Sequence, residues 1–262
     1  MTQVKRLASI LVFIACAAGM SAAQDLDYFR KTLSSDNIDA KRTVLLQIRE
    51  LKSEEASRIA TKTITDRNEM IRATAASAMT GLQPAEAVTV LAPLLNDSSP
   101  FVRTEAAYAL GRVGDVTATQ PLVTVLQKDA AKEARAAAAI SLGKIGDVAA
   151  VGPLTGVFKK SPSEDNEFIR RSAARAIGEV AEHTRANGGT PELTVFRTAV
   201  PVLIKALNNS KETDDTRREA AYALGAIRDR EALPALNAHL NSPDYYLADI
   251  CKKAIAAIES GQ

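Results

Sequence analysis

Apolar residues recur along most of the chain with the spacing of helices that bury one face. In one such segment the apolar residues are Val102, Ala106, Ala107, Leu110 and Val113. This spacing places them on a single side of an α-helix. Segments with the same pattern begin at residues 40, 71, 134, 169, 216 and 247. We therefore predict a helix in each segment, with close approach of neighbouring helices at the small alanine positions.

A second, shorter apolar helix is predicted before each of these segments. Several of the shorter helices should begin with a proline, since the N–H that proline lacks has no partner in the first helical turn; these are Pro121, Pro153, Pro201 and Pro234. The turn between the two helices carries an acid that suits turns and helix N-caps: Asp66, Asp97, Asp129, Asp165 or Asp244. Glycines, as in Gly111–Gly114, should close the second helix.

These helix pairs repeat with a short period. Successive segments start 31, 31, 32, 35, 47 and 31 residues apart, and the heptapeptide Glu105–Gly111 occurs again as Glu219–Gly225. Aromatic residues are 4% of the chain and Trp is absent, which favours helix over sheet. A single hairpin cannot bury its apolar face alone, so seven hairpins are expected to stack in one dimension.

The unit resembles a HEAT repeat of the short bacterial type, which is also found in phycobilin-lyase-like proteins. HEAT repeats have a proline in the first helix, an aspartate eight residues later and an arginine six residues after that, as in Pro121, Asp129 and Arg135. The resemblance covers about residues 25–259 and implies an all-α fold, an α-solenoid wound as a right-handed superhelix of about seven HEAT-like helical hairpins. Ankyrin and tetratricopeptide repeats are alternatives of similar period, although their signature motifs are absent.

An arginine follows the turn acid in five units: Arg72, Arg103, Arg135, Arg170 and Arg217. An arginine in this place can donate hydrogen bonds to turn carbonyls and to the acid of its own or a neighbouring repeat. We expect this column to be structural. The alternative is anion binding along a groove.

The N-terminus indicates export. Lys5 and Arg6 precede the apolar run Leu7–Ala18 and then small residues, which is typical of a secretory signal peptide at residues 1–23. The HEAT-like domain would then span residues 24–262, and the periplasm is the expected location. Alternatives are secretion, or an outer-membrane lipoprotein with a lipid anchor on Cys16. No later run approaches the ~20 apolar residues of a membrane span.

Charge and cysteine content exclude several classes of function. Removal of residues 1–23 takes away Lys5 and Arg6 and no acid, which leaves 31 basic and 31 acidic residues. A balanced chain has no global field for nucleic acid or an anionic membrane. Cys251 would be the single remaining cysteine, so no intramolecular disulfide is expected.

Catalytic motifs are sparse. A di-iron hydroxylase built on similar repeats depends on several His-Glu pairs, whereas the only histidines here are His183 and His239, and neither precedes a glutamate. We therefore predict no catalytic residues, no metal and no cofactor, and a protein that is not an enzyme. An alternative from the enzyme class is a bilin-lyase-like or other enzyme subunit that holds a small ligand in the groove.

The 47-residue interval predicts an inserted loop at about residues 182–197. A long loop on a rigid scaffold often carries recognition, although exposed loops also tolerate neutral insertions.

The second helices also predict a binding surface. Their third, seventh and eleventh positions lie on one stripe that the core does not need, and in HEAT-like solenoids this side is usually concave. The candidate partner-binding residues are Tyr108, Arg112, Ile140, Lys144, Arg171, Arg175, Arg218 and Tyr222. Tyrosine and arginine are enriched at interface hot spots, and the basic excess favours a protein partner with an acidic segment. The alternative is that the two tyrosines cover seams between repeats. The predicted function is an exported scaffold that binds another protein through this surface, the inserted loop, or both.

Overall fold

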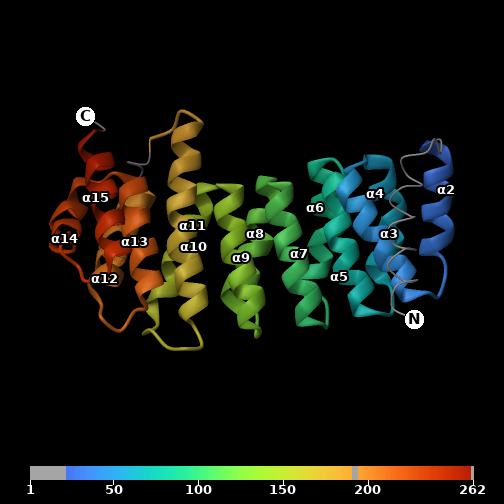
Figure 1. Ribbon diagram of the computed structural model, residues 1–262, viewed down its shortest axis with the longest axis horizontal. Coiled ribbons are helices and arrows are strands. Elements are labelled where there is room, and N and C mark those ends of the chain that lie inside the picture. The colour runs from blue at the N-terminus through green and yellow to red at the C-terminus, as the bar shows by residue number, and fades with distance from the viewer. Residues whose placement is uncertain (1–21, 191–193, 261–262) are drawn as a thin grey trace, which may run out of the picture. The chain divides into compact units, whose positions relative to one another are not determined.

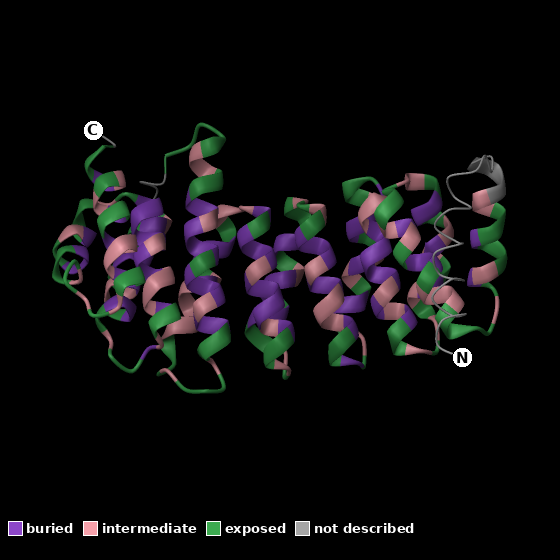
Figure 2. Cartoon of the chain, in the orientation of Figure 1, coloured by how far each residue is buried: buried purple, intermediate pink, exposed green. Residues whose placement is uncertain are grey.

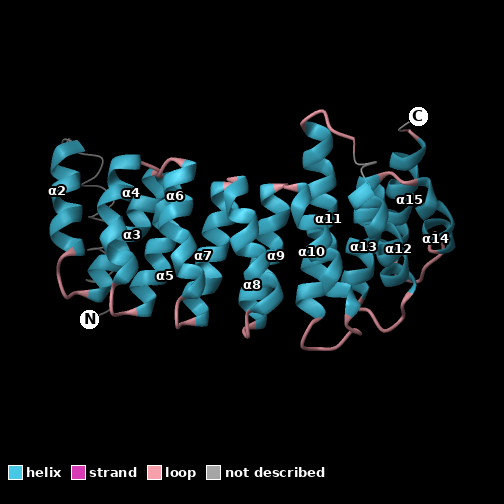
Figure 3. Cartoon of the chain, turned by 180° about the vertical axis from the view of Figure 1, so that it is seen from behind, coloured by secondary structure: helices cyan, strands magenta, loops and turns pink. Residues whose placement is uncertain are grey.

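The computed structural model describes residues 22–190 and 194–260, and the regular elements in that part of the chain are all helical (Figure 3). Its fourteen α-helices, α2 to α15, form seven consecutive hairpins, joined or completed by short 3-10 turns. The predicted all-α solenoid of about seven hairpins is therefore confirmed. The expected signal peptide falls largely outside the described residues and stays a prediction.

The first compact unit, Met1–Leu82, holds two hairpins in its described part. They consist of α2 (Ala22–Leu33), α3 (Ile38–Leu51), α4 (Glu54–Ala60) and α5 (Glu69–Ala78). Val44, Ile48 and Ile71 have no exposed surface and form part of its core. Side-chain oxygens of Asn37 and Asn68 cap α3 and α5 by accepting backbone N–H groups.

The second compact unit, Gln83–Gln262, holds the other five hairpins. Their first helices are α6 (Pro84–Leu91), α8 (Thr119–Lys128), α10 (Val151–Gly156), α12 (Thr194–Asn208) and α14 (Leu233–Ala238). Their second helices are α7 (Pro100–Val113), α9 (Lys132–Ile145), α11 (Glu167–Ala186), α13 (Asp214–Ile227) and α15 (Tyr245–Glu259). Within this unit each second helix packs against the next one, and buried residues run along their lengths (Figures 1 and 2).

Small residues let these second helices approach closely. The alanine pair Ala106 and Ala107 is fully buried, as the pattern predicts. A Cβ added to Gly111 of α7 would lie 2.5 Å from the Ser141 hydroxyl of α9, far inside van der Waals contact. Gly111 is therefore a packing residue inside the helix and not part of the stop signal, which corrects the prediction for this glycine.

The helix stops lie three residues further on. Gly114 and Gly146 both have φ of 75°, the left-handed conformation that ends a helix at little cost for glycine. Arg228 takes the same conformation after α13, with φ of 64°, where the sequence offers no glycine. The predicted stops after α7 and α9 are thus confirmed.

The first-turn prolines are found as predicted, with one exception. Pro121, Pro153 and Pro234 lie within the first three residues of their helices, but Pro201 lies inside α12. The prediction for Pro201 is wrong because α12 begins at Thr194, upstream of the expected start.

The inserted segment is mostly helix, which corrects the loop predicted at 182–197. α11 continues to Ala186 and α12 begins at Thr194; residues 191–193 lie outside the described residues. The extension of α11, visible beyond its neighbours in Figure 1, is held by the Arg185 guanidinium, which donates to the Ala226 carbonyl of α13. None of the described helices has the length and apolar character needed to cross a membrane.

Candidate functional site

Charged side chains tie successive hairpins together at the turns. Arg103 of α7 donates from Nε and Nη2 to both carboxylate oxygens of Asp129, each at 2.7 Å, and also bonds the Asp97 carbonyl of its own turn. In the first unit, Lys41 donates to Asp66 at 2.7 Å. The predicted structural use of this column is confirmed, since the cations bind turn carbonyls and the acid of the next repeat.

The corresponding contact of α11 is the most deeply buried. Arg170 bonds both oxygens of Glu212, and the two side chains are 4% and 2% exposed. Its Nη1 donates to the Lys160 carbonyl at 2.7 Å. The acid here is a glutamate that the sequence pattern did not single out, whereas the predicted turn acid Asp165 is exposed on a lengthened turn.

The predicted binding stripe lies on four second helices of the second unit. Arg112 and Lys144 are exposed, and Tyr108 and Ile140 are half-buried. Ala136 and Ala226, which share the stripe, are buried. The surface is therefore accessible on α7 and α9 at its charged ends, while its small positions belong to the packing.

Tyr222 covers the seam between α11 and α13. Its ring lies under the Arg175 guanidinium at 4.5 Å, and a Cβ on Gly178 would meet that ring at 2.5 Å. Burial, followed by a hydrogen bond with Glu182, raises the pKa of the Tyr222 hydroxyl. Arg175 also donates to Glu179 at 3.0 Å. For Tyr222 the seam-covering reading is confirmed.

Two further arginines of the stripe are paired within the chain. Arg171 donates to Asp215 at 3.0 Å, and Arg218 donates to Asp215 and to both oxygens of Asp244. Arg218 also lies 5.3 Å from the centre of the Tyr246 ring. These ion pairs neutralise much of the basic excess on α11 and α13, so positive charge remains most accessible on α9, at Lys144.

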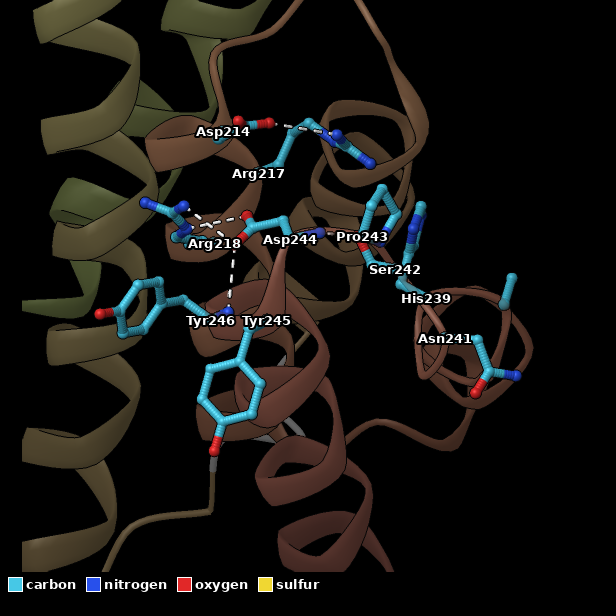
Figure 4. A pocket seen from close by; sticks show the side chains of 11 residues that line it. Asp214, Arg217, Arg218, His239, Asn241, Ser242, Pro243, Asp244, Tyr245 and Tyr246 are labelled. Atoms are coloured by element: carbon cyan, nitrogen blue, oxygen red, sulfur yellow. Dashed lines mark hydrogen bonds and ion pairs between the residues drawn. The ribbon is translucent and has the colours of Figure 1, made fainter.

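A pocket that sequence reasoning missed opens between α13 and the start of α15. The pocket has a volume of about 800 Å³ and is open to solvent. In its wall, Arg218 points at Asp244 and Arg217 points at Asp214 (Figure 4). Tyr245 and Tyr246 are 76% and 67% exposed. The sequence did offer one signal for this pocket. The chain has five tyrosines, and two of them are adjacent here.

The two histidines lie apart from each other in the sequence and make different contacts. His239 lines this pocket, and its Nε2 lies 2.9 Å from the Asn208 side-chain oxygen. Burial lowers the pKa of His239, and the charge of Arg217 lowers it further. His183 is exposed on α11. Across residues 22–190 and 194–260, no group of three or more His, Cys, Asp and Glu side chains is arranged to hold a metal ion.

The stacked hairpins, the buried small residues and the turn ladder define a helical repeat protein. HEAT repeats match three overlapping stretches, residues 59–143, 120–192 and 165–257. Together these stretches span more than half of the chain, so the chain belongs to the HEAT-repeat family.

Solved structures share this fold. Kap121p is 15% identical with a TM-score of 0.63, over 89% of this chain and 28% of that one. An engineered protein is 22% identical with a TM-score of 0.59, over 90% and 69%. The complex of CpcE and CpcF of phycocyanin lyase from Nostoc sp. PCC7120 is 20% identical with a TM-score of 0.52, over 93% and 96%. At these identities the likeness shows the fold alone.

Two curated relatives correct one prediction. Deoxyhypusine hydroxylases of Bos taurus and Gallus gallus are each 36% identical over 63 residues, which is 24% of this chain and 21% of each relative. The chain thus matches about a fifth of the length of these relatives. These relatives are enzymes, which contradicts the expectation that this chain is not an enzyme.

Proposed function

We propose that this HEAT-repeat chain is an exported scaffold that binds another protein through the second helices of its second unit. The observation that carries the proposal is the face shared by α7 and α9, where Arg112 and Lys144 are exposed beside the half-buried Tyr108 and Ile140. Aromatic and aliphatic anchors rimmed by charge are typical of protein interfaces. Such a face suits a partner segment that carries acidic and apolar side chains.

Export rests on the N-terminal sequence, where two cations precede an apolar run. The intact mass of the exported product tests it. A chain that begins at Gln24 would support ordinary cleavage and a periplasmic location. A diacylglyceryl mass on a chain that begins at Cys16 would support the lipid-anchored form.

Site-directed cross-linking tests the binding face. A photo-reactive residue in place of Lys144 should capture one partner in the native envelope, whereas the same residue in place of Lys128, exposed on α8, should not. Equal capture from both positions would contradict the assignment.

Affinity measurements with the captured partner sharpen the test. Tyr108→Ala and Lys144→Glu should each weaken binding by about 1–2 kcal/mol, with Lys128→Glu as the control and melting temperature as the check on folding. If both variants bind normally but shortening residues 187–190 abolishes binding, the segment between α11 and α12 is the recognition element instead.

A further inference from the structure

A second, smaller pocket lies on the side of the first helices, at the seam between the fifth and sixth hairpins. It encloses about 120 Å³, and α10 and α12 contact each other beside it. It is lined by residues from the 3-10 turn after α10, the following turn, α12 and the turn after α12, and by Arg170 of α11. None of the candidate partner-binding residues is among them.

The backbone around this pocket is held in place. Arg170 bonds the Lys160 carbonyl at 2.7 Å, and the Asn166 side-chain amide donates to the Ser161 carbonyl at 2.9 Å. The Arg170 guanidinium also packs over the Phe158 ring at 4.6 Å. A buried arginine therefore fixes the backbone of the segment that carries two of the pocket's lysines, so that little backbone ordering is left for a ligand to cause.

The charges that line the pocket are unbalanced. Lys159, Lys160 and Lys205 are exposed, and they come from two successive hairpins. The acid in the lining is Glu212, which is 2% exposed and bound by Arg170. The buried pair neutralises itself, and the lining then holds three lysines with no further acid among its residues.

A neutral donor adds to this set. The side-chain oxygen of Asn209 accepts the Lys211 backbone N–H at 3.0 Å, which leaves the Asn209 amide NH₂ group to donate elsewhere. Asn209 lines the pocket together with Ser161. The lining thus offers hydrogen-bond donors in addition to positive charge.

We infer that this pocket binds a compact oxyanion, a phosphate, sulfate or carboxylate group. Its volume is well below the roughly 300–1,000 Å³ of sites for drug-sized ligands, which suits a single charged group. Lysine ammonium groups are point charges that bind oxyanions without the planar geometry that arginine imposes. The inference goes beyond the proposed function, because no residue of the α7 and α9 face lines this pocket.

Titration of the mature chain with inorganic phosphate, followed by amide NMR shifts and compared with chloride at matched ionic strength, tests the inference. We expect saturable shifts at residues 159–161 and 209. The variant Lys159→Gln/Lys205→Gln should weaken phosphate binding about tenfold or more, which corresponds to about 1.4 kcal/mol. The matched control is Lys128→Gln/Lys132→Gln, which removes two exposed lysines at the regular turn before α9 and should bind phosphate normally.

Glutamate in place of phosphate identifies the source of the oxyanion. Saturation by both probes supports a site for any compact oxyanion, and saturation by phosphate alone supports a phosphoryl or sulfate group. Saturation by glutamate alone supports a carboxylate. The inference is overturned if neither phosphate nor glutamate causes a saturable shift beyond chloride, or if the double variant binds the saturating probe as tightly as the parent chain. Cross-linking at Lys144 is independent of these outcomes, so the two proposals can fail separately.

Discussion

The seam between α7 and α9 and the seam between α11 and α13 are built from the same repeat but held by different contacts. At α7 and α9, Gly111 packs directly on Ser141, whose hydroxyl donates to the Ala107 carbonyl at 2.7 Å. At α11 and α13 the corresponding glycine, Gly178, packs on the ring of Tyr222, with Arg175 above that ring. The first seam depends on small residues, and the second also depends on a charged and aromatic layer.

The ion pairs of the two seams also differ, in the sequence separation of the residues they join. Arg103 reaches Asp129, 26 residues later, whereas Arg170 reaches Glu212, 42 residues later. The longer separation reflects the extension of α11 and the early start of α12. The comparison teaches that an inserted segment can be absorbed by helices when a new acid, in a different sequence position, restores the contact at the turn.

Breaking the buried pair of the expanded seam should have the largest effect. Arg170→Met leaves the Glu212 carboxylate buried without its partner, and we expect a loss of about 3–5 kcal/mol in the free energy of unfolding. Arg103→Met should cost less, since the Arg103 side chain is 15% exposed and water can reach the site. Urea denaturation followed by circular dichroism measures both.

The double variant Arg170→Met/Glu212→Leu provides the control. Replacing both charges with apolar groups should restore most of the lost stability. A double variant as unstable as Arg170→Met alone would show that the Lys160 carbonyl contact, and not the ion pair, stabilises this seam.

Overpacking the regular seam should have an intermediate effect. Gly111→Ala places a Cβ against Ser141, and Ala107→Leu adds volume at a fully buried site, so each should cost about 1–3 kcal/mol. Gly156→Ala in α10 is the matched control, because a Cβ there meets nothing within 4 Å and the backbone is in the right-handed helical conformation. This control should gain up to about 1 kcal/mol from helix propensity. Equal losses at all three sites would mean that the assigned register is wrong.

The smallest of these effects should be on the way stability depends on acid pH. Burial alone would raise the pKa of Asp129, but the hydrogen bonds from Arg103 and from the Ala131 N–H outweigh it and hold that pKa below its usual range. A carboxyl group whose pKa is lower in the folded chain than in the unfolded chain stabilises the fold above the ordinary pKa of about 3.9. This contribution is lost as the pH falls from that value through the lower pKa of the folded chain. Asp129→Asn should therefore reduce the fall in the free energy of unfolding between pH 7 and pH 3, on the order of 1 kcal/mol. Urea unfolding at a series of pH values measures this fall.

Glu219, at the expanded seam, should respond in the opposite sense. Its burial raises its pKa, and the nearby charge of Arg175 only partly offsets this. Its penalty at neutral pH is relieved as the pH falls through the raised value. Asp129→Asn and Glu219→Gln should thus change the slope of stability against pH with opposite signs, and slopes of equal sign would contradict the comparison.

Part of the candidate site could be predicted and part could not. The stripe on α7 and α9 follows from helical geometry alone, which is why Arg112 and Lys144 are exposed as expected. The contacts of Arg171, Arg175 and Arg218 across the seams could not be predicted, because the acids they reach there come from the neighbouring helix or from a turn further along the chain. The two pockets likewise depend on which turns the stacking brings together.

The sequence by itself determined the number of hairpins, the buried face of each second helix and the stops at Gly114 and Gly146. These features depend on interactions within about one helical turn, so the period of apolar residues and the position of a glycine are enough to specify them. Tertiary structure decided how the expanded interval is used, which acid each arginine binds, and that Lys159 and Lys205 share one pocket. Each of these depends on the distance between segments far apart in the chain, which is set only when neighbouring repeats pack.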